Sequence, residues 1–435
     1  MKSLKRGSRL ITLMISVFII GMIVLIAKIQ MEASFYISNS GSRNLGYIYD
    51  RNGDIIFDDN AENGQYPDGY FKDLGNLIGD ASGQMTNTLV AKNLEKLSNY
   101  SFTSGITYKG GKAAIYSTLS HEANEAVYSA FGDKDGCAIA YNYKTGEILV
   151  CVSRPSVDPL KGYEDLAEGS LLCKAFYKTV PGSTQKIATL ISAVETMGMD
   201  ALMEKSFTCN GVYTNNTGLD IVCHNEYGHG TQNIREAFAN SCNPFFAQLV
   251  EDSGWSLSDI EDCYKKLGYS VNGSEETEIS IDGIISSKAS TTLEDKNEFN
   301  TQWSCIGQGT SLVSPCQLMM WQSAIANESG KSTMPYLIDH VTNVNGRTVE
   351  NASTNYSEQL FSSQTASEVK DIMLENGLNY TGKIPGYTLG IKSGTAQVKD
   401  GKEENSLLTG FVDDKDFPIA FAILCLLYTS DAADD

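Results

Sequence analysis

Residues 180–191 read Val-Pro-Gly-Ser-Thr-Gln-Lys-Ile-Ala-Thr-Leu-Ile, and they predict a helix that begins beside a serine. Pro181 and Gly182 interrupt the chain, and apolar residues then recur at helical spacing. Residues three apart share a helix face, so the amine of Lys186 can reach the hydroxyl of Ser183. A serine beside a lysine amine is the arrangement of a nucleophile and its base.

A lysine in the first turn of a helix is unfavourable for stability, because the positive end of the helix dipole disfavours a second cation. The same effect favours a neutral amine, which is the form that a general base needs. Burial near Lys392 would lower the pKa of Lys186 further. Taken alone, however, the pattern is more often a helix-capping serine beside a solvated lysine, so the interpretation depends on other motifs.

A second pattern, Ser241-Cys-Asn243, interrupts a helical run that extends from residue 233 to residue 250. A loop between helices can direct its side chains into a cleft. Ser241 can relay a proton between Lys186 and a leaving amine, and the Asn243 amide can orient a substrate carbonyl. By itself this pattern would be an ordinary helix cap.

The third pattern, Lys392-Ser-Gly-Thr395, lies in an alternating stretch that predicts a strand over residues 388–398. Alternation places Lys392 and Gly394 on one face, where the missing side chain of Gly394 lets another backbone approach closely. A peptide can dock along such a strand, with its carboxylate at Lys392. The residues that we expect to bind substrate are Lys392, Ser393, Gly394, Thr395 and Gln397.

All three patterns occur in one order, on a predicted helix, loop and strand, as serine acyl-enzymes of the S-x-x-K type require. On these residues the chain resembles a class B penicillin-binding protein, a membrane-anchored peptidoglycan D,D-transpeptidase. Residues 136–159, Ile306-Gly-Gln-Gly309 with the following Val313-Ser-Pro-Cys-Gln-Leu318, and residues 48–53 extend the resemblance. It implies an α+β fold, in which helices flank a five-stranded antiparallel sheet.

The resemblance also implies a role for each motif residue. Ser183 would be acylated by a stem peptide ending in D-Ala-D-Ala, with Lys186 as base and Ser241 as relay. Asn243 would position the substrate, and the backbone N–H groups of Ser183 and Thr395 would form the oxyanion hole. β-Lactams would be covalent inhibitors, and a glycan polymerase in the same membrane would be a partner.

Other functions remain open at this point. Residues 375–379, Glu-Asn-Gly-Leu-Asn, spell the motif of the deacylating glutamate of a class A β-lactamase, but they lie far from Ser241 and close to Lys392 in the sequence. None of the four histidines lies in a nucleophile elbow, which argues against a Ser-His-Asp triad. A D,D-carboxypeptidase, a β-lactam sensor and a structural division protein are alternatives with the same fold.

The amino terminus predicts a single membrane anchor. Four cationic residues among the first nine precede an uncharged, mostly apolar stretch at residues 10–27, which is long enough to nearly cross the bilayer core. The positive flank predicts that the rest of the chain lies outside the cytoplasm. A cleavable signal peptide is the rival, but the apolar run is long and no A-x-A site follows. A formal net charge of -20 disfavours nucleic-acid binding.

Ten cysteines are present, most of them in apolar strands or helices where they read as small hydrophobic residues. Cys209 and Cys223 flank a predicted hairpin at residues 210–222 and form the best candidate disulfide. Together with His224 and His229 they are an alternative zinc site of unconventional spacing. We expect neither a metal ion nor another cofactor in the reaction.

The predicted organisation is a cytoplasmic tail at residues 1–9, a transmembrane anchor at 10–29, a small pedestal at 30–111 with one helix near residues 88–98, and the transpeptidase domain at 112–425. We expect this domain to begin with a helix at residues 121–131 and a hairpin around residues 144–146, and to return to the same sheet with a hairpin that turns at residues 413–416. The pedestal is too short for a glycosyltransferase domain. Residues 426–435 resemble foreign sequence, where the family would supply a further strand and a long closing helix. We therefore expect a truncated carboxyl end.

Overall fold

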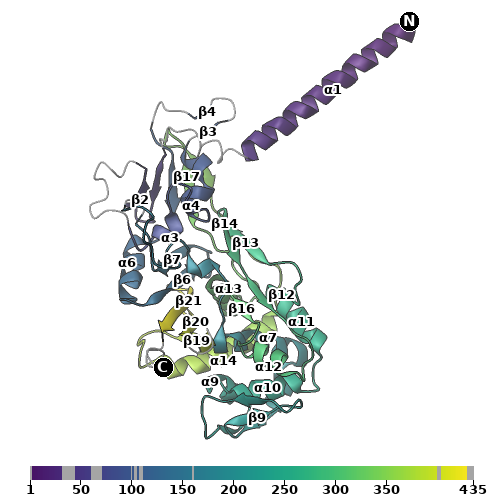
Figure 1. The fold of residues 1–435 in the computed structure, drawn as a ribbon, viewed down its shortest axis with the longest axis vertical. Helices are drawn as coiled ribbons and strands as arrows, with labels where there is room; N and C mark the ends of the chain where they lie inside the picture. Colours follow the sequence, from purple (N-terminus) through teal and green to yellow (C-terminus); the bar gives the residue numbers. More distant parts are fainter. Residues whose placement is uncertain are drawn as a thin grey trace.

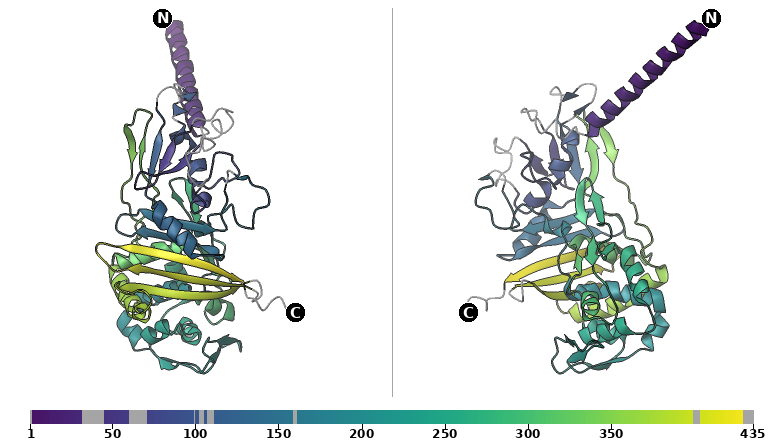
Figure 2. Two further views of the ribbon diagram at one scale, coloured as in Figure 1. Left: turned by 90° about the vertical axis from the view of Figure 1, so that its left-hand side faces the viewer. Right: turned by 45° about the vertical axis from the view of Figure 1, so that its right-hand side comes forward.

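The computed structural model describes residues 2–31, 45–59, 71–98, 100–101, 105–106, 111–158, 161–398 and 403–428. Helix α1 (Lys2–Met31) stands apart from the rest of the molecule in every view (Figures 1 and 2). The remaining elements follow one another along the long axis, from a small sheet near α1, through a larger sheet, to a helical part at the opposite end (Figure 1). The predictions for residues 32–44, 60–70 and 429–435 fall outside the described residues.

The small sheet near α1 has five strands in the order β18-β17-β5-β1-β2. Its strands are β1 (Tyr47–Tyr49), β2 (Ile55–Asp58), β5 (Ala114–Ser117), β17 (Ile338–Thr342) and β18 (Thr348–Asn351). Strands β17 and β18 come from late in the chain, and the His340 ring stacks on Tyr116 of β5 with centroids 4.2 Å apart. The boundary between pedestal and transpeptidase domain at residue 112 remains a prediction. The small sheet contains strands from both sides of this boundary, since β17 and β18 lie within residues 338–351.

Short elements complete this part of the molecule: α3 (Gly75–Ile78), α4 (Leu89–Lys92), α5 (Leu94–Leu97), β3 (Tyr100–Ser101) and β4 (Gly105–Ile106). Sequence periodicity suggested one helix near residues 88–98, whereas the structure divides this segment at Asn93. The Asn93 side-chain amide donates to the backbone oxygens of Leu89 and Asp282, at 3.0 and 2.9 Å. This asparagine therefore links the small sheet region to the rest of the chain instead of continuing a helix.

The larger sheet has five strands in the order β19-β20-β21-β6-β7, and every neighbouring pair is antiparallel. The strands are β6 (Asp135–Asn142), β7 (Ile148–Arg154), β19 (Leu389–Val398), β20 (Glu403–Val412) and β21 (Ile419–Tyr428). The predicted fold class and the hairpins around residues 144–146 and 413–416 are confirmed. Strand β19 lies at one edge, which leaves its outer backbone free for an additional strand.

Helices α13 (Pro315–Ala326) and α14 (Ser363–Gly377) pack on this sheet, α13 against β21, β20 and β6, and α14 against β19. Every residue of α13 is buried, and most of its sequence is apolar, although it also carries Gln317, Gln322 and Ser323. Helix α6 (His121–Ala130) packs on β7, and its Asn124 side chain bonds to the backbone of Leu149 and Cys151. The predicted helix at residues 121–131 is therefore confirmed.

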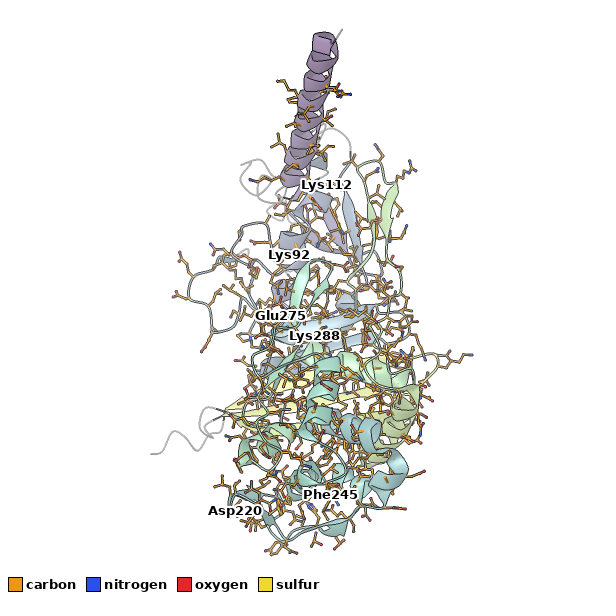
Figure 3. All side chains as sticks on the ribbon, turned by 90° about the vertical axis from the view of Figure 1, so that its right-hand side faces the viewer. Lys92, Lys112, Asp220, Phe245, Glu275 and Lys288 are labelled. Carbon is orange, nitrogen blue, oxygen red and sulfur yellow. The ribbon has the colours of Figure 1, made fainter. Side chains whose placement is uncertain are left out.

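The helical part lies farthest from α1, where Asp220 and Phe245 are seen in Figure 3. Its helices and 3-10 turns are η4 (Gly182–Gln185), α7 (Lys186–Met197), α8 (Met199–Met203), α9 (Ile234–Ala239), α10 (Asn243–Glu251), α11 (Leu257–Lys266) and α12 (Phe299–Cys305). The 3-10 turn η3 (Lys174–Phe176) packs instead on β6, β7 and α13, and η5 (Leu378–Tyr380) follows α14. Two small two-stranded sheets accompany them, β8 (Phe207–Cys209) with β11 (Gly230–Gln232), and β9 (Val212–Thr214) with β10 (Asp220–Val222).

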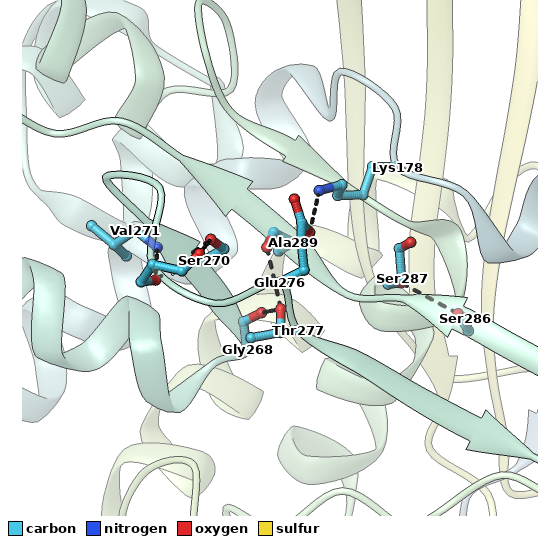
Figure 4. Close-up of polar contacts among 10 residues, drawn as sticks. Lys178, Gly268, Ser270, Val271, Glu276, Thr277, Ser286, Ser287 and Ala289 are labelled. Carbon is cyan, nitrogen blue, oxygen red and sulfur yellow. Dashed lines mark hydrogen bonds and ion pairs between the residues drawn. The ribbon is translucent and has the colours of Figure 1, made fainter.

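A second group of short strands joins the helical part to the small sheet: β12 (Tyr269–Val271), β13 (Glu278–Ile281), β14 (Ile284–Ser287), β15 (Ala289–Thr291) and β16 (Leu312–Val313). Polar contacts hold the start of this segment (Figure 4). The Thr277 hydroxyl donates to the backbone oxygens of Gly268 and Ala289. Lys178 forms an ion pair with Glu276 at 2.8 Å. At its far end Asn87 exchanges two hydrogen bonds with the backbone of Ile285, both 2.8 Å long. The β13–β14 hairpin therefore connects the two ends of the molecule.

Candidate active site

The 3-10 turn η4 carries Ser183, and α7 begins at Lys186. The sequence predicted that a helix would open at Ser183, and the structure places a tighter turn there before the α-helix starts. Both geometries keep residues three apart on one side, and the Lys186 Nζ atom lies 2.8 Å from Ser183 Oγ. The predicted pairing of these two side chains is therefore present.

Lys186 is fully buried, and its Nζ atom also contacts two carbonyl oxygens, Ser241 O at 2.8 Å and Asn243 Oδ1 at 2.7 Å. Carbonyl oxygens can only accept, so they take the two N–H groups of a neutral amine. The lone pair of that amine then faces the Ser183 hydroxyl. Asn243 therefore orients Lys186, a role that the sequence analysis did not give it.

Burial lowers the pKa of the Lys186 ammonium to about 7, while the nearby thiols of Cys242 and Cys223 act more weakly in the opposite direction. At neutral pH a large fraction of the side chain is therefore the neutral amine. A base with a pKa near the working pH combines the correct protonation state with a useful driving force for proton transfer.

Ser241 lies in the short connection between α9 and α10, with a φ of 52°. This left-handed conformation is uncommon for a residue other than glycine and turns the chain sharply before α10. Ser241 Oγ accepts a hydrogen bond from Lys392 Nζ at 2.9 Å and lies 3.4 Å from Lys186 Nζ. The hydroxyl thus stands between the two lysines, as a proton relay requires.

Strand β19 approaches η4 through two glycines. A Cβ atom on Gly394 would lie 2.8 Å from Pro181 O and 3.0 Å from Ser183 N, and one on Gly182 would lie 2.6 Å from Thr395 O. The predicted close approach of another backbone at Gly394 is confirmed. It brings the third motif against the nucleophile.

The predicted alternation along β19 is also observed. Lys392 is buried, whereas Ser393 and Thr395 are exposed. Lys392 Nζ donates to Ser393 O at 2.8 Å, and burial followed by the charge of Lys186 lowers the pKa of Lys392 well below its usual value. Gln397 lies in β19, but its side chain is outside the described residues.

A surface hollow of about 240 Å³ opens over these groups. Its lining comes from all three motifs and one histidine: Ser183, His224, Ser241, Asn243, Ser393, Gly394 and Thr395. His224 was considered at the sequence level only as a metal ligand. The fold of residues 207–232 brings His224 to the hollow. No pattern around His224 in the sequence predicts this placement.

Glu375, the residue of the lactamase-like motif, lies on α14 and forms an ion pair with Arg235 of α9 at 2.9 Å. Its side chain is 54% exposed and does not line the hollow. The structure therefore gives no support to a deacylating role for Glu375.

The candidate disulfide between Cys209 and Cys223 is not formed, since both are buried free thiols. Instead they lie in a cluster with His229 and Cys242, the middle residue of the second motif. The ligand atoms of these four side chains lie within 4.8 Å of one another. His224, which the sequence analysis grouped with them, is not a member of this cluster.

Comparisons with known proteins agree with this geometry. The family profile described as penicillin binding protein transpeptidase domain matches residues 136–429. Stage V sporulation protein D of Bacillus subtilis is 32% identical over 288 residues, which cover 63% of this chain and 42% of that protein. Peptidoglycan D,D-transpeptidase PbpA of Mycolicibacterium smegmatis is 26% identical over 319 residues, which cover 68% of this chain and 62% of that protein.

Solved structures show the same fold. The crystal structure of PBPA from Mycobacterium tuberculosis superposes with a TM-score of 0.74 at 19% identity, covering 88% of this chain and 93% of that one. An imipenem acyl-enzyme complex of penicillin-binding protein A from M. tuberculosis gives a TM-score of 0.73 at 19% identity, covering 88% and 94%. The chain spans about two fifths to three fifths of the length of the first two curated relatives.

Proposed function

Because the chain belongs to the penicillin-binding protein transpeptidase family, as a class B member, we propose that it is a peptidoglycan D,D-transpeptidase. The observation that carries this proposal is the contact of 2.8 Å between Ser183 Oγ and the buried Lys186 amine, whose pKa is lowered to about 7. A serine hydroxyl is a weak nucleophile until a base accepts its proton. The proposed substrate is a stem peptide that ends in D-Ala-D-Ala.

In the first step Ser183 Oγ attacks the carbonyl carbon between the two D-alanines, and its proton passes to Lys186. The backbone N–H groups of Ser183 and Thr395 stabilise the oxyanion, a contribution of about 3 to 4 kcal/mol per donor in comparable sites. The tetrahedral intermediate collapses when the C–N bond breaks. The leaving amine of the terminal D-alanine takes a proton from Lys186 through Ser241, and an ester on Ser183 remains.

In the second step the amine of another stem peptide attacks that ester, and the same groups move the proton in the reverse direction. A cross-linked peptide leaves, and the Ser183 hydroxyl is restored. Substrate positioning is assigned to the edge strand β19, where Ser393 and Thr395 face outward and the buried Lys392 amine lies behind them. The carboxylate of the substrate would bind at this point.

β-Lactams fit the same proposal, because their strained amide places a carbonyl and a carboxylate where the peptide would present them. The solved structures of penicillin-binding protein A from M. tuberculosis include acyl-enzyme complexes with imipenem and penicillin G. A fluorescent penicillin should therefore label this chain covalently at Ser183. The Ser183→Ala variant should lose the label, whereas Ser192→Ala, a change on α7 outside the hollow, should keep it.

A folded wild-type chain that takes up no label would rule out the enzymatic proposal. Incubation with stem peptides then separates cross-linking from carboxypeptidase action. Dimeric peptide products support a transpeptidase, and release of D-alanine without dimers supports a carboxypeptidase.

The proposed location is the cytoplasmic membrane, with α1 as a single span and the catalytic part outside. The span at Ile11–Lys28 has a mean hydropathy of 2.5, and cationic residues precede it. We include a glycan polymerase of the same membrane as a partner contacted through α1. Affinity capture with and without residues 1–29 tests this contact, which should require the anchor.

A further inference from the structure

We infer that Cys209, Cys223, His229 and Cys242 bind a Zn²⁺ ion that holds the Ser241–Asn243 motif in place. The four ligand atoms lie within 4.8 Å of one another, and the Cys223 Sγ to His229 Nδ1 distance is 3.5 Å. A tetrahedral zinc site with bonds of about 2.3 Å to sulfur and 2.0 Å to nitrogen separates such a pair by about 3.6 Å. The side chains therefore stand close to the geometry of a bound ion.

The chemistry of the set favours zinc. Three thiolates and one imidazole form a Cys₃His site, one of the common structural zinc sites, and the four protein ligands leave no open position for catalysis. The three cysteines are almost entirely buried, which shields the thiolates from solvent and oxidation. A single disulfide would use two of the three sulfur atoms and leave a third thiol against the bond.

The ligands come from three separate segments that the backbone brings together. Cys209 ends β8, and His229 precedes the paired strand β11, with the His229 N–H bonded to Cys209 O at 3.0 Å. Cys223 follows β10, and its N–H bonds to Gly211 O at 2.8 Å. Cys242 precedes α10. A bound ion would cross-link two hairpins to the helix that carries the second motif.

Tight turns support this arrangement. Gly211 and Gly228 have φ values of 91° and 74°, and a Cβ atom on either would lie within 2.3 Å of a backbone oxygen, that of Glu226 and that of Cys209 respectively. These glycines allow the two ligand-bearing loops to pack against each other. The Nε2 atom of Gln232 is buried and has no hydrogen-bond partner among the described residues. The same side chain lies beside Cys242. A metal-bound thiolate at Cys242 would accept that N–H.

The hairpin region needs such a cross-link. Strands β8 to β11 have three residues each, and several apolar side chains of residues 207–232 remain exposed, among them Val212, Leu219, Val222 and Tyr227. A segment with so little buried apolar surface gains stability from a metal ion. The nearby catalytic groups would share this stabilisation.

The coupling to the active site is direct. Ser241 and Asn243 flank Cys242, and His224, which lines the hollow, follows Cys223. The Asn243 side-chain amide also donates to Val222 O, the residue before Cys223, at 3.0 Å. Thus the ion would fix both the motif and the backbone group that holds Asn243. The ion itself takes no part in acyl transfer.

The test begins with the zinc content of the full chain, purified under reducing conditions and measured by inductively coupled plasma mass spectrometry. We expect about one zinc per chain, a loss of most of it in Cys209→Ser and His229→Ala, and no loss in Cys263→Ser. Cys263 is a matched control because it is a nearly buried thiol of α11 that contacts Thr196 and lies outside the cluster. This measurement does not depend on the proposed function.

Cobalt substitution of the wild-type chain provides a second measurement if a ligand variant fails to fold. The visible absorption of a tetrahedral cobalt–thiolate centre supports the site, and its absence from folded, cobalt-treated protein overturns it. A reduced, folded chain without zinc, in which all three cluster thiols react freely, also overturns the inference. So does a disulfide between any two of the three.

The positioning role rests on the proposed function and has its own readout. Cys209 does not line the hollow, so its replacement by serine tests positioning through the ion alone. The rate of acylation by fluorescent penicillin should fall roughly tenfold or more in folded Cys209→Ser, as with other changes around metal sites. Cys263→Ser should acylate like wild type. Zinc loss with unchanged acylation would retain the metal site and overturn its positioning role.

Discussion

At the scale of single residues, the environment of Lys186 explains how a lysine can serve as a base near neutral pH. Burial disfavours the ammonium form, although the face of the Phe246 ring, 5.7 Å from Lys186 Nζ, is itself a favourable site for a cation. The Ser241 and Asn243 carbonyls then fix the direction of the neutral amine. Neither effect could be obtained from the first motif alone, because both come from residues more than fifty positions later.

The acylation rate should therefore depend on pH with an apparent pKa of about 7. Below that value Lys186 is protonated, and the rate should fall by about tenfold per pH unit; above it the rate should level off. The charged or titratable groups near Lys186 are Lys392 of β19, His224 and the thiols of Cys223 and Cys242. Stopped-flow acylation by a chromogenic β-lactam between pH 5.5 and 9 measures this profile.

Thermal melts at each pH are the control, since the profile is meaningful only where the chain stays folded. An acylation rate that is flat from pH 5.5 to 9 would contradict the assignment of Lys186 as the base.

Gly394 should not tolerate a methyl group. A Cβ atom there would lie 2.8 Å from both Pro181 O and Thr184 N, and these backbone atoms can move only with η4 itself. We expect Gly394→Ala to slow penicillin acylation by at least about tenfold, because a shift of η4 moves Ser183 away from the oxyanion donors. The matched control is Gly382→Ala, where the new Cβ would meet no atom within 4 Å.

Both variants should be compared by acylation rate and by melting temperature. Equal acylation rates in Gly394→Ala and Gly382→Ala would contradict the importance of the close contact between β19 and η4.

The order of the three motifs in the sequence selects Ser183, Lys186, Ser241, Asn243 and Lys392, and the structure brings these five side chains together. The sequence did not predict the hollow's His224 or the thiol cluster around Cys242. These groups meet through the two small hairpins of residues 207–232, whose pairing depends on glycine turns rather than on apolar periodicity. The roles assigned to the motif residues remain proposals.

At the scale of elements, the packing of α9 beside α14 shows what Glu375 of the lactamase-like motif contacts. The ion pair between Arg235 and Glu375 joins these two helices at the surface, away from the hollow. Exposed ion pairs of this kind contribute about 0 to 1 kcal/mol. Glu375 is therefore placed for a weak contact between helices, and it has no route to the ester on Ser183.

Glu375→Gln should leave the hydrolysis of the penicilloyl ester unchanged and should alter the melting temperature only slightly. The release of label from the acylated chain over several hours measures the first effect, and differential scanning fluorimetry measures the second. Arg235→Gln is the matched control, because it removes the same ion pair from the other side. Faster loss of label in wild type than in Glu375→Gln would revive the lactamase hypothesis.

Long-range pairing marks the limit of sequence-based prediction at this scale. The strands that follow one another in the chain, such as β20 and β21, were predicted because a turn at residues 413–416 separates two apolar runs. The pairing of β17 with β5 joins residues more than two hundred positions apart, and no local pattern specifies it. The prediction of one helix near residues 88–98 was wrong, because the structure has two short helices that meet at Asn93. The Asn93 side chain donates to the backbone oxygen of Asp282, a contact that the local sequence does not specify.

At the scale of the whole molecule, α1 and the catalytic part are separate in their packing. None of the residues of the apolar span is buried against the rest of the protein, and large apolar side chains such as Phe18 and Ile23 are exposed. Such a surface is stable only in a lipid or detergent environment. The cores of both five-stranded sheets are built without it.

Removal of residues 1–31 should therefore release the chain from the membrane without unfolding it. Among the described residues the hydrophobic cluster begins at Leu45 and contains no side chain of α1. The melting temperature of the remaining chain should therefore change by less than about 2 °C. Penicillin labelling of Ser183 should persist, because every group that contacts it belongs to residues after 180. Membrane fractionation should move the labelled protein from the pellet to the supernatant.

If the shortened chain instead remained in the pellet while folded and labelled, a second membrane-binding surface would have to exist on the catalytic part. If it lost its label and melted at lower temperature, α1 would have to contribute to the fold, against the exposure of its side chains.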